Sequence, residues 1–384
     1  MRFSVVSSAL VAALVGYGAS VAIVISAATA LSATPAQTAS WIFVLCLGKA
    51  VGSAFLSAFA QMPVVLAWST PGAALIAATN GVTMAEGVGA FLLAGVLIAL
   101  TGAFRPLGRL IAMIPDGIAA AMLAGVLLPF CVQGALAAQA LPGLILPMIA
   151  AFLLVRLRNP AMAVLAALTV GLTVAFAFAF GTATLPPLRL PVPAVTFITP
   201  EFRPDVLIGL GVPLYLITMA SQNLPGFATL RAAGFEPPVR AALAVTGGLS
   251  AVVAFFGAHT VSVAAITAAI CLGDDVHPDR SQRWKVGLAY GAIWVVLGLL
   301  SPLILTILAA LPRDLMAGLV ALALIGPLSG AISGAMTQPA TRFAATVTLA
   351  VTASGVAAFG VGAAFWGLMA GLLVYCVERM RKTA

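Results

Sequence analysis

Apolar residues follow one another along this chain in stretches far longer than the core of a water-soluble protein requires. Charged side chains are absent from ten such stretches, among them 3–48, 50–85, 117–155, 241–273 and 343–377. A helix of about 20 apolar residues crosses the hydrocarbon core of a bilayer, so the longer stretches hold two spans each. Divided at Pro, Gly and Asn, the chain is predicted to be an all-α polytopic membrane protein with fourteen transmembrane segments, seven before residue 190 and seven after residue 204.

Two of the predicted spans, the third and the tenth, contain a break where polar and helix-breaking residues interrupt the apolar run. The first break is Trp68–Gly72 (WSTPG), and the second is Gly257–Ser262 (GAHTVS). Backbone groups freed by a break are too costly to expose to lipid, so breaks persist only beside protein or an aqueous cavity. Corresponding breaks in two halves are typical of substrate sites in secondary transporters. The alternative is that Ser, Thr and Pro merely kink packed helices.

Each break is predicted to start a half-helix. Ser69 or Thr70 suits the N-cap of the first half-helix, with Pro71 at the first helical position, and Thr260 or Ser262 suits the N-cap of the second. A helix N-terminus carries about half a positive charge. Two such ends that face each other are expected to hold a small anion, such as a carboxylate.

An odd number of spans in each half means that a second copy of the first half would lie inverted in the membrane. Residues 110–129 align with 307–326 and share five identities, including Pro115 with Pro312. The predicted units are therefore a first inverted repeat (1–180), a periplasmic linker (181–204) and a second inverted repeat (205–384).

Composition and charge agree with a membrane protein. Hydrophobic residues make up 62% of the 384 residues, charged residues 7%, and the mean hydropathy is +1.18. With the N- and C-termini in the cytoplasm, 14 of the 18 Lys and Arg residues fall in cytoplasmic loops, as the positive-inside rule requires. The net charge of +8 therefore reflects topology, and because aromatic residues do not alternate with these basic residues, we expect no nucleic-acid partner.

Few polar residues within the spans are candidates for chemistry. His259 could carry a coupled proton near neutral pH, or be a neutral imidazole that holds the break open. Gln222 and Asn223 could bind substrate or bond across helices. Lys49, inside the second span, could be the counter-ion of a bound carboxylate or could bond to a carbonyl. The acidic loop 274–279 is more simply a solvated loop than a metal site.

Three segments resemble signature stretches of the benzoate/proton symporter (BenE) family: AWSTPGAAL (67–75), MASQNLPGFATLRAAGF (219–235) and FFGAHTVSVAAITAAICLG (255–273). The resemblance extends over essentially the whole chain, although Lys49 is not part of the family pattern. It implies a carrier in the bacterial inner membrane, related in fold to uracil and purine permeases and to sulfate-type anion transporters. It also implies a core of spans 1–4 and 8–11, a gate of spans 5–7 and 12–14, and frequent homodimers.

The resulting hypothesis is import of benzoate or a similar aromatic carboxylate with a proton, by movement of the core past the gate. His259 is the expected proton-coupling residue. The alternatives are a nucleobase/proton symporter or an anion exchanger of the same fold and, less favoured, a membrane-embedded enzyme; no cofactor is expected. The residues expected to bind substrate are Tyr17, Trp68, Ser69, Thr70, Gly72, Tyr215, Gln222, Asn223, Thr260 and Ser262.

Overall fold

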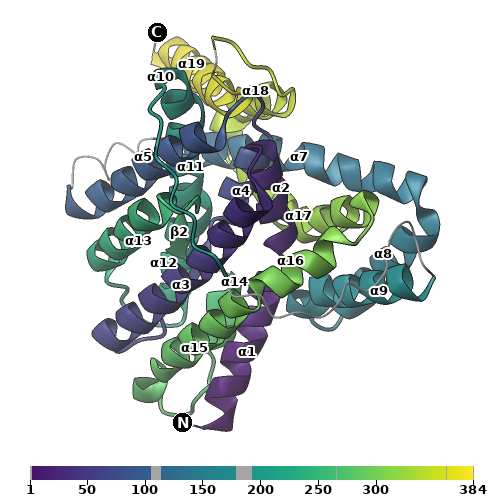
Figure 1. Cartoon of the computed structure of the whole chain (residues 1–384). Coiled ribbons are helices and arrows are strands. Elements are labelled where there is room, and N and C mark those ends of the chain that lie inside the picture. The colour runs from purple at the N-terminus through teal and green to yellow at the C-terminus, as the bar shows by residue number, and fades with distance from the viewer. Residues whose placement is uncertain (1, 105–113, 179–192, 265, 360, 384) are drawn as a thin grey trace.

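The computed structural model of the chain describes residues 2–104, 114–178, 193–264, 266–359 and 361–383. Helices make up most of these residues, and two three-residue strands lie near the centre of the molecule (Figure 1). The predicted all-α class is confirmed in its main feature. The two strands are the exception, and each overlaps one end of a predicted break.

The first half contains long helices separated by the first break. Capping boxes start two of the helices: Thr34 with Gln37 at α3, and Thr83 with Glu86 at α5. The elements are α1 (Phe3–Gly18), α2 (Val21–Ala30), α3 (Pro35–Ala60), β1 (Leu66–Trp68), α4 (Thr70–Ala77), α5 (Met84–Ala103), α7 (Asp116–Ala140), α8 (Pro142–Arg156), the 3-10 turn η1 (Pro160–Met162) and α9 (Ala163–Ala177).

The second half opens with a helix that is interrupted twice by π turns. Pro213 and Pro225 lack the backbone N–H that would continue the α-helical pattern, and the π turns η2 and η3 precede them. The elements are α10 (Pro204–Val206), η2 (Leu207–Gly211), α11 (Val212–Thr218), η3 (Met219–Asn223), α12 (Leu224–Ala232), α13 (Val239–Ala254), β2 (Val261–Val263), α14 (Ile266–Leu272), η4 (Arg280–Gln282), α15 (Lys285–Leu299), α16 (Ser301–Ala309), α17 (Arg313–Met336), η5 (Pro339–Thr341), α18 (Arg342–Ala353) and α19 (Ala363–Thr383).

Within the described ranges, seven helical segments are long and apolar enough to cross a membrane. An eighth is added if the pair 280–299 and 301–309, bent by 53°, forms one span. The helices α8, α9 and α13 are apolar but shorter. The chain is thus a helical membrane protein, and the count of fourteen spans, which includes the short and broken segments, stays a prediction.

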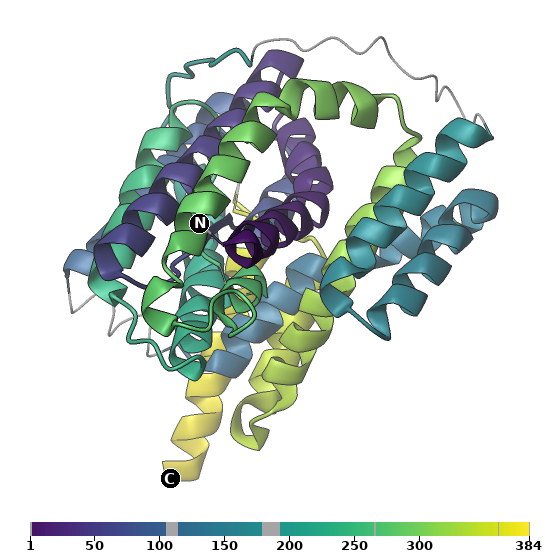
Figure 2. The ribbon, with the colours of Figure 1, turned by 90° about the horizontal axis from the view of Figure 1, so that it is seen from below.

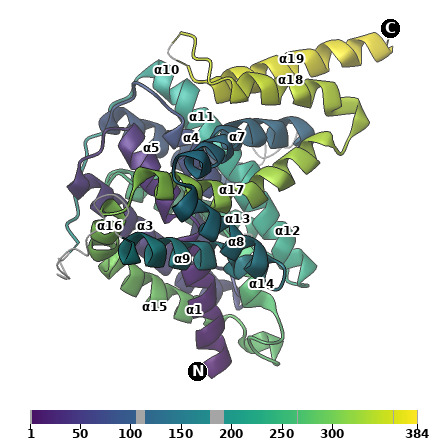
Figure 3. The same cartoon turned by 90° about the vertical axis from the view of Figure 1, so that its right-hand side faces the viewer.

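The packing joins the two halves of the chain element by element. The helix α3 packs along α15, α5 along α13 and α7 along α17, and β1 pairs with β2. Figure 2 shows α8 and α9 at one side of the molecule and α3 and α13 at the other, with α17 between them. The helices α18 and α19 lie side by side at the end opposite the N-terminus (Figure 3).

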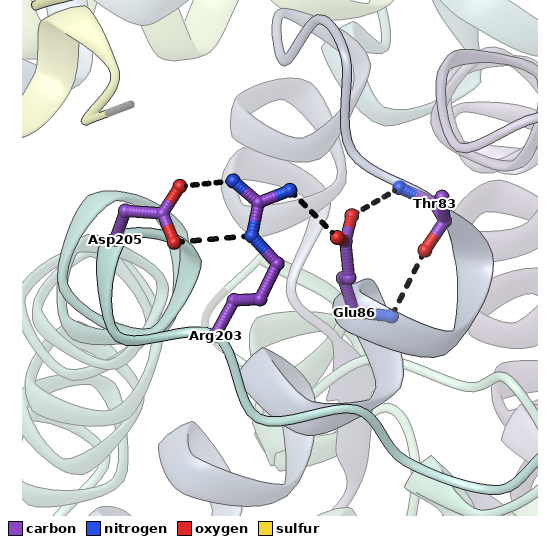
Figure 4. A network of polar contacts seen from close by, with 4 residues as sticks. All are labelled: Thr83, Glu86, Arg203 and Asp205. Atoms are coloured by element: carbon purple, nitrogen blue, oxygen red, sulfur yellow. Dashed lines mark hydrogen bonds and ion pairs between the residues drawn. The ribbon is translucent and has the colours of Figure 1, made fainter. Parts of the chain in front are cut away.

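The described part of the predicted linker, 193–203, has an extended backbone that is fastened to the helical bundle; residues 181–192 lie outside the described ranges. At its end, Arg203 Nη1 lies 2.8 Å from Glu86 Oε1, and its Nη2 lies 2.5 Å from Asp205 Oδ2 (Figure 4). The hydrogen bonds with Asp205 and then Glu86 raise the pKa of the Arg203 guanidinium above its usual value. Glu86 also closes the capping box with Thr83, so one carboxylate ties the linker to the start of α5.

Candidate functional site

The two predicted breaks lie side by side as an antiparallel pair of strands. Trp68 is opposite Val261, and Leu66 is opposite Val263. The pairing continues at one end, where Ser69 N–H donates to the Thr260 carbonyl at 3.0 Å. Each break therefore supplies hydrogen-bond partners for the backbone groups that the other leaves free, which meets the requirement for interrupted backbone at membrane depth.

The first break starts a half-helix in the predicted way, and the two hydroxyls proposed as caps in the second break bond to neighbouring elements. Ser69 Oγ accepts a hydrogen bond from Gly72 N–H at 3.1 Å, and Pro71 lies in the first turn of α4, so the N-cap prediction is confirmed. Thr260 Oγ1 instead bonds to Thr218 Oγ1 at 2.9 Å, and Ser262 Oγ donates to the Ala67 carbonyl at 3.3 Å. Both lie on the strand side of the break; residue 265 is outside the described ranges and α14 is described from Ile266, so the cap of the second half-helix stays a prediction.

His259 is fully buried, and protein atoms occupy both of its ring nitrogens. Trp41 Nε1 donates to His259 Nδ1 at 3.0 Å, and His259 Nε2 lies 3.1 Å from the Ser69 carbonyl. An indole N–H can only donate, so Nδ1 must accept and Nε2 must carry the hydrogen. This arrangement fits the second alternative for His259, a neutral imidazole that holds the break open. The two hydrogen bonds also connect α3 to both breaks.

The adjacent carboxamides Gln222 and Asn223 point to different places. Asn223 is fully buried, and its Oδ1 accepts a hydrogen bond from Val263 N–H at 2.9 Å. It thus provides a partner for a backbone amide of β2. Gln222 lines a cavity. Both residues belong to the π turn η3, which directs Asn223 to the strand pair and Gln222 to the cavity.

That cavity has a volume of about 710 Å³, within the usual range of small-molecule sites. Its wall consists of α1, α3, the break with α4, η3, α12, α14 and α15 on one side, and of α7 and α17 on the other. Most lining residues are apolar. The polar or amphipathic ones are Ser20, Lys49, Trp68, Thr70, Asp116, Ser221, Gln222, Thr267 and Tyr290.

Three of the predicted substrate-binding residues, Trp68, Thr70 and Gln222, line this cavity. Tyr215 lies elsewhere, with its hydroxyl 2.5 Å from Thr101 Oγ1. The remaining predicted residues support the wall without lining it: Tyr17, Ser69, Gly72, Asn223, His259, Thr260 and Ser262. Asp116, Ser20 and Tyr290 were not predicted, because a cavity lined by residues from many distant helices leaves no local signal in the sequence.

Aromatic rings surround Lys49 at the cavity wall. Its Nζ lies 3.0 Å from the centroid of the Trp294 ring and 3.9 Å from that of Trp68. The two indoles meet at 5.3 Å in a T-shaped contact, and the Tyr17 ring lies 5.8 Å from Trp68. Trp68 Nε1 donates to Ser20 Oγ at 2.6 Å, which fixes the orientation of its ring.

The ammonium group of Lys49 has no carboxylate partner. All ten acidic residues of the chain fall within the described ranges, and none of them forms an ion pair with Lys49 there. The side chain is 1% exposed. A desolvated cation–π contact contributes about 2 kcal/mol, whereas taking an ion out of water costs several kcal/mol. The indoles therefore offset part of this cost, and an anion in the cavity would supply the missing counter-charge.

The acidic loop 274–279 is held by structural contacts. Arg283 pairs with Asp274 and also donates to the carbonyls of Leu272 and His277. Hydrogen bonds from Ser281 lower the pKa of Asp279. In the part of the chain that the structure describes, no group of three His, Cys, Asp or Glu residues could hold a metal ion.

Comparisons with known proteins agree with a transport site. The model of the family described as benzoate membrane transport protein (BenE) matches residues 1–377. The inner membrane protein YdcO of Escherichia coli (strain K12) is 38% identical over 367 residues, 95% of this chain and 93% of that protein. The benzoate membrane transport protein of Acinetobacter baylyi is 33% identical over 367 residues, which are 95% of this chain and 93% of that protein.

Solved structures with the same fold are much more distant in sequence. The transmembrane domain of the cyanobacterial bicarbonate transporter BicA has a TM-score of 0.63 at 14% identity, covering 97% of this chain and 98% of that one. The murine anion transporter Slc26a9, solved in an inward-facing state, has a TM-score of 0.61 at 14% identity, covering 98% of this chain and 68% of that one.

Proposed function

Because the chain belongs to the family of benzoate membrane transport proteins, we propose that it is a secondary active transporter that imports benzoate or a similar aromatic carboxylate together with a proton. The observation that carries this proposal is the cavity at the paired breaks, where a buried lysine without a carboxylate partner lies between two indole rings. An aromatic carboxylate has the two properties that this wall complements, an apolar ring and a negative charge.

The proposed binding mode uses the side chains on the cavity wall. The ring of the substrate would pack against Trp68, and its carboxylate would face the start of α4, where Thr70 also lies. Gln222, on the same wall, would donate a hydrogen bond to this carboxylate. Ser69, Asn223 and Thr260 would act indirectly, because their hydrogen bonds hold the breaks that form the wall. The other predicted contacts, from Tyr17, Gly72, Tyr215 and Ser262, stay predictions.

The proposed movement is an elevator, in which spans 1–4 and 8–11 form the core and spans 5–7 and 12–14 form the gate. Two features support it. The cavity lies between α7 and α17, assigned to the gate, and elements assigned to the core. The packing is also symmetric when the two halves are exchanged. In an inverted repeat α3 would correspond to α13 and α5 to α15. The contact between α3 and α15 would then have its counterpart in a contact between α13 and α5, and both contacts are present. This symmetry supports the inverted repeat of seven plus seven spans.

Symport of one proton with one carboxylate would be electroneutral, so a pH gradient would drive accumulation and the membrane potential would contribute little. The assignment of that proton to His259 stays a prediction, and the contacts of its ring favour a structural role instead. Cytoplasmic termini in the bacterial inner membrane and a homodimer complete the proposal; the inner-membrane relative supports the location.

The test is uptake of labelled benzoate into proteoliposomes with and without an inward proton gradient. Protonated benzoic acid crosses lipid unaided, so protein-free vesicles with the same gradient must be subtracted, and the protein-dependent part must saturate and be competed by unlabelled benzoate. We expect saturable accumulation with the gradient and no change when the membrane potential is clamped. Absence of any saturable benzoate uptake by folded protein would contradict the proposal.

Anion exchange is the second candidate, and the fold favours it specifically. The structural neighbours transport bicarbonate or other anions according to their descriptions, on the same arrangement of helices. In the same vesicles, exchange would require internal benzoate or another anion and would be insensitive to the proton gradient. The uptake experiment therefore separates the two candidates.

A further inference from the structure

We propose that Lys49 carries the proton that accompanies the substrate: its side chain is a neutral amine when the cavity is empty and an ammonium ion when a carboxylate is bound. This inference rests on the proposed function and assigns its proton to one residue. It starts from the geometry of the cavity wall, where Lys49 is the one described residue that combines a basic nitrogen, near-complete burial and contact with the cavity.

The surroundings of Lys49 leave it without a permanent counter-charge. The titratable groups that face it are Cys46 on its own helix, Tyr17 on α1, Tyr290 on α15 and His259 before β2. None of them is a carboxylic acid. The one carboxylate that lines the same cavity is Asp116, which is exposed at the start of α7 on the other wall and makes no ion pair with Lys49. The Tyr290 hydroxyl donates to the Leu66 carbonyl at 3.1 Å, and both nitrogens of His259 are occupied. An isolated ammonium in such a site is unfavourable, so an empty cavity favours the uncharged amine.

A bound carboxylate reverses this preference. The negative charge of the substrate and the two indole faces then stabilise a cation at the same position. The amine takes one proton from the aqueous side from which the substrate enters, and the product is an ammonium–carboxylate pair with no net charge. On the other side, the substrate leaves as an anion and the amine returns the proton to water. One carboxylate and one proton cross together, and charge balances at each step.

His259 is less suited to this role. Protonation of Nδ1 would place a second N–H against the Trp41 indole N–H, which has no acceptor to offer, and would break the contact that positions the breaks. His259 also does not line the cavity, so a substrate carboxylate would not meet its ring. Lys49, in contrast, lines the cavity, and its Nζ lies 3.9 Å from the centroid of the Trp68 ring, which lines the cavity as well.

The experiment measures proton uptake on benzoate binding by purified protein in weakly buffered detergent solution, with a pH indicator near neutral pH. The variants are Lys49→Met, which removes the charge, and Lys49→Arg, which makes it permanent. Lys285→Met, at the start of α15 and outside the cavity lining, is the matched control for the same chemical change. Thermal unfolding of each variant checks that it is folded.

We expect the wild-type protein and Lys285→Met to take up about one proton per benzoate bound. Lys49→Met should lose affinity by roughly 30-fold or more, the range for removal of one member of a buried charge pair. Lys49→Arg should bind benzoate without proton uptake, since arginine stays protonated in proteins.

Two results would overturn the inference while leaving the proposed function intact. One is benzoate binding by the wild-type protein with no proton uptake, and the other is unchanged affinity and proton uptake in Lys49→Met. If the wild-type protein binds no benzoate at all, the proposed function fails and this inference fails with it.

Discussion

The indole of Trp41 donates a hydrogen bond to His259 Nδ1 at 3.0 Å, across 218 positions of the chain. With the second contact of His259, to the Ser69 carbonyl, this bond connects α3 to both breaks beside the cavity. The histidine is thereby placed as a positioning residue behind the wall, and its replacement separates this role from proton transfer.

His259→Gln should retain proton-driven uptake, because a carboxamide can accept from Trp41 and donate to the Ser69 carbonyl. His259→Ala leaves the Trp41 indole N–H buried and unpaired, at a cost of about 1–3 kcal/mol, while the Ser69 carbonyl keeps its hydrogen bond from Ala73 N–H. We therefore expect a lower unfolding temperature and reduced uptake. The measurements are thermal unfolding and vesicle uptake. If His259→Gln is fully folded, still exchanges benzoate, and no longer responds to the proton gradient, then His259 carries the proton.

The adjacent carboxamides offer a second paired test. Asn223→Ala removes the acceptor of the Val263 N–H in β2 and should lower the free energy of unfolding by about 1–3 kcal/mol. Gln222→Ala should leave stability nearly unchanged and weaken benzoate binding, because Gln222 lines the cavity. Thermal unfolding and a binding titration are made on both variants. The reverse pattern, with Gln222→Ala unstable and Asn223→Ala deficient only in binding, would contradict the assignment.

Two neighbouring glycines on α13 test the packing of the halves. A Cβ atom on Gly247 would collide with the backbone of Ala99 on α5, whereas a Cβ on Gly248 would meet nothing within 4 Å. We expect Gly247→Ala to destabilise the protein by about 1–3 kcal/mol, the usual cost of overpacking. Gly248→Ala should be neutral or stabilising, by up to about 1 kcal/mol. Equal unfolding temperatures for the two variants would show that α5 and α13 do not approach this closely.

The carboxylate of Glu86 has two functions that substitutions can separate. Glu86→Gln keeps a side-chain acceptor for the Thr83 N–H and loses the ion pair with Arg203, which is half exposed on the arginine side, so we expect a loss of about 1 kcal/mol or less. Glu86→Ala also loses the capping box, with an expected further loss of about 1 kcal/mol. Denaturation curves in low and high salt measure the contributions of the ion pair and of the capping box to the free energy of unfolding. Only the contribution of the ion pair should decrease in high salt.

Local patterns in the sequence were sufficient for the membrane class, the two breaks and the Ser69 cap. Each rests on neighbouring residues: a long charge-free run, a Pro–Gly pair, or a hydroxyl three positions before an amide. The prediction that Thr260 or Ser262 caps the second half-helix stays a prediction, because α14 is described only from Ile266. The local signal did not reveal the strand: pairing with β1, almost 200 positions away, places Ser262 in β2.

The sequence by itself therefore determined that this chain is a helical membrane protein of the benzoate transport family with a break in each half. Only the tertiary structure decided that the breaks pair, that Asn223 faces the strands while Gln222 faces the cavity, and that Lys49 lies against Trp294 with no acid beside it. The physical reason is that a side chain's charge partner and exposure depend on which distant helices pack around it. Composition sets the preference of each segment for lipid, but packing sets the neighbours of each atom.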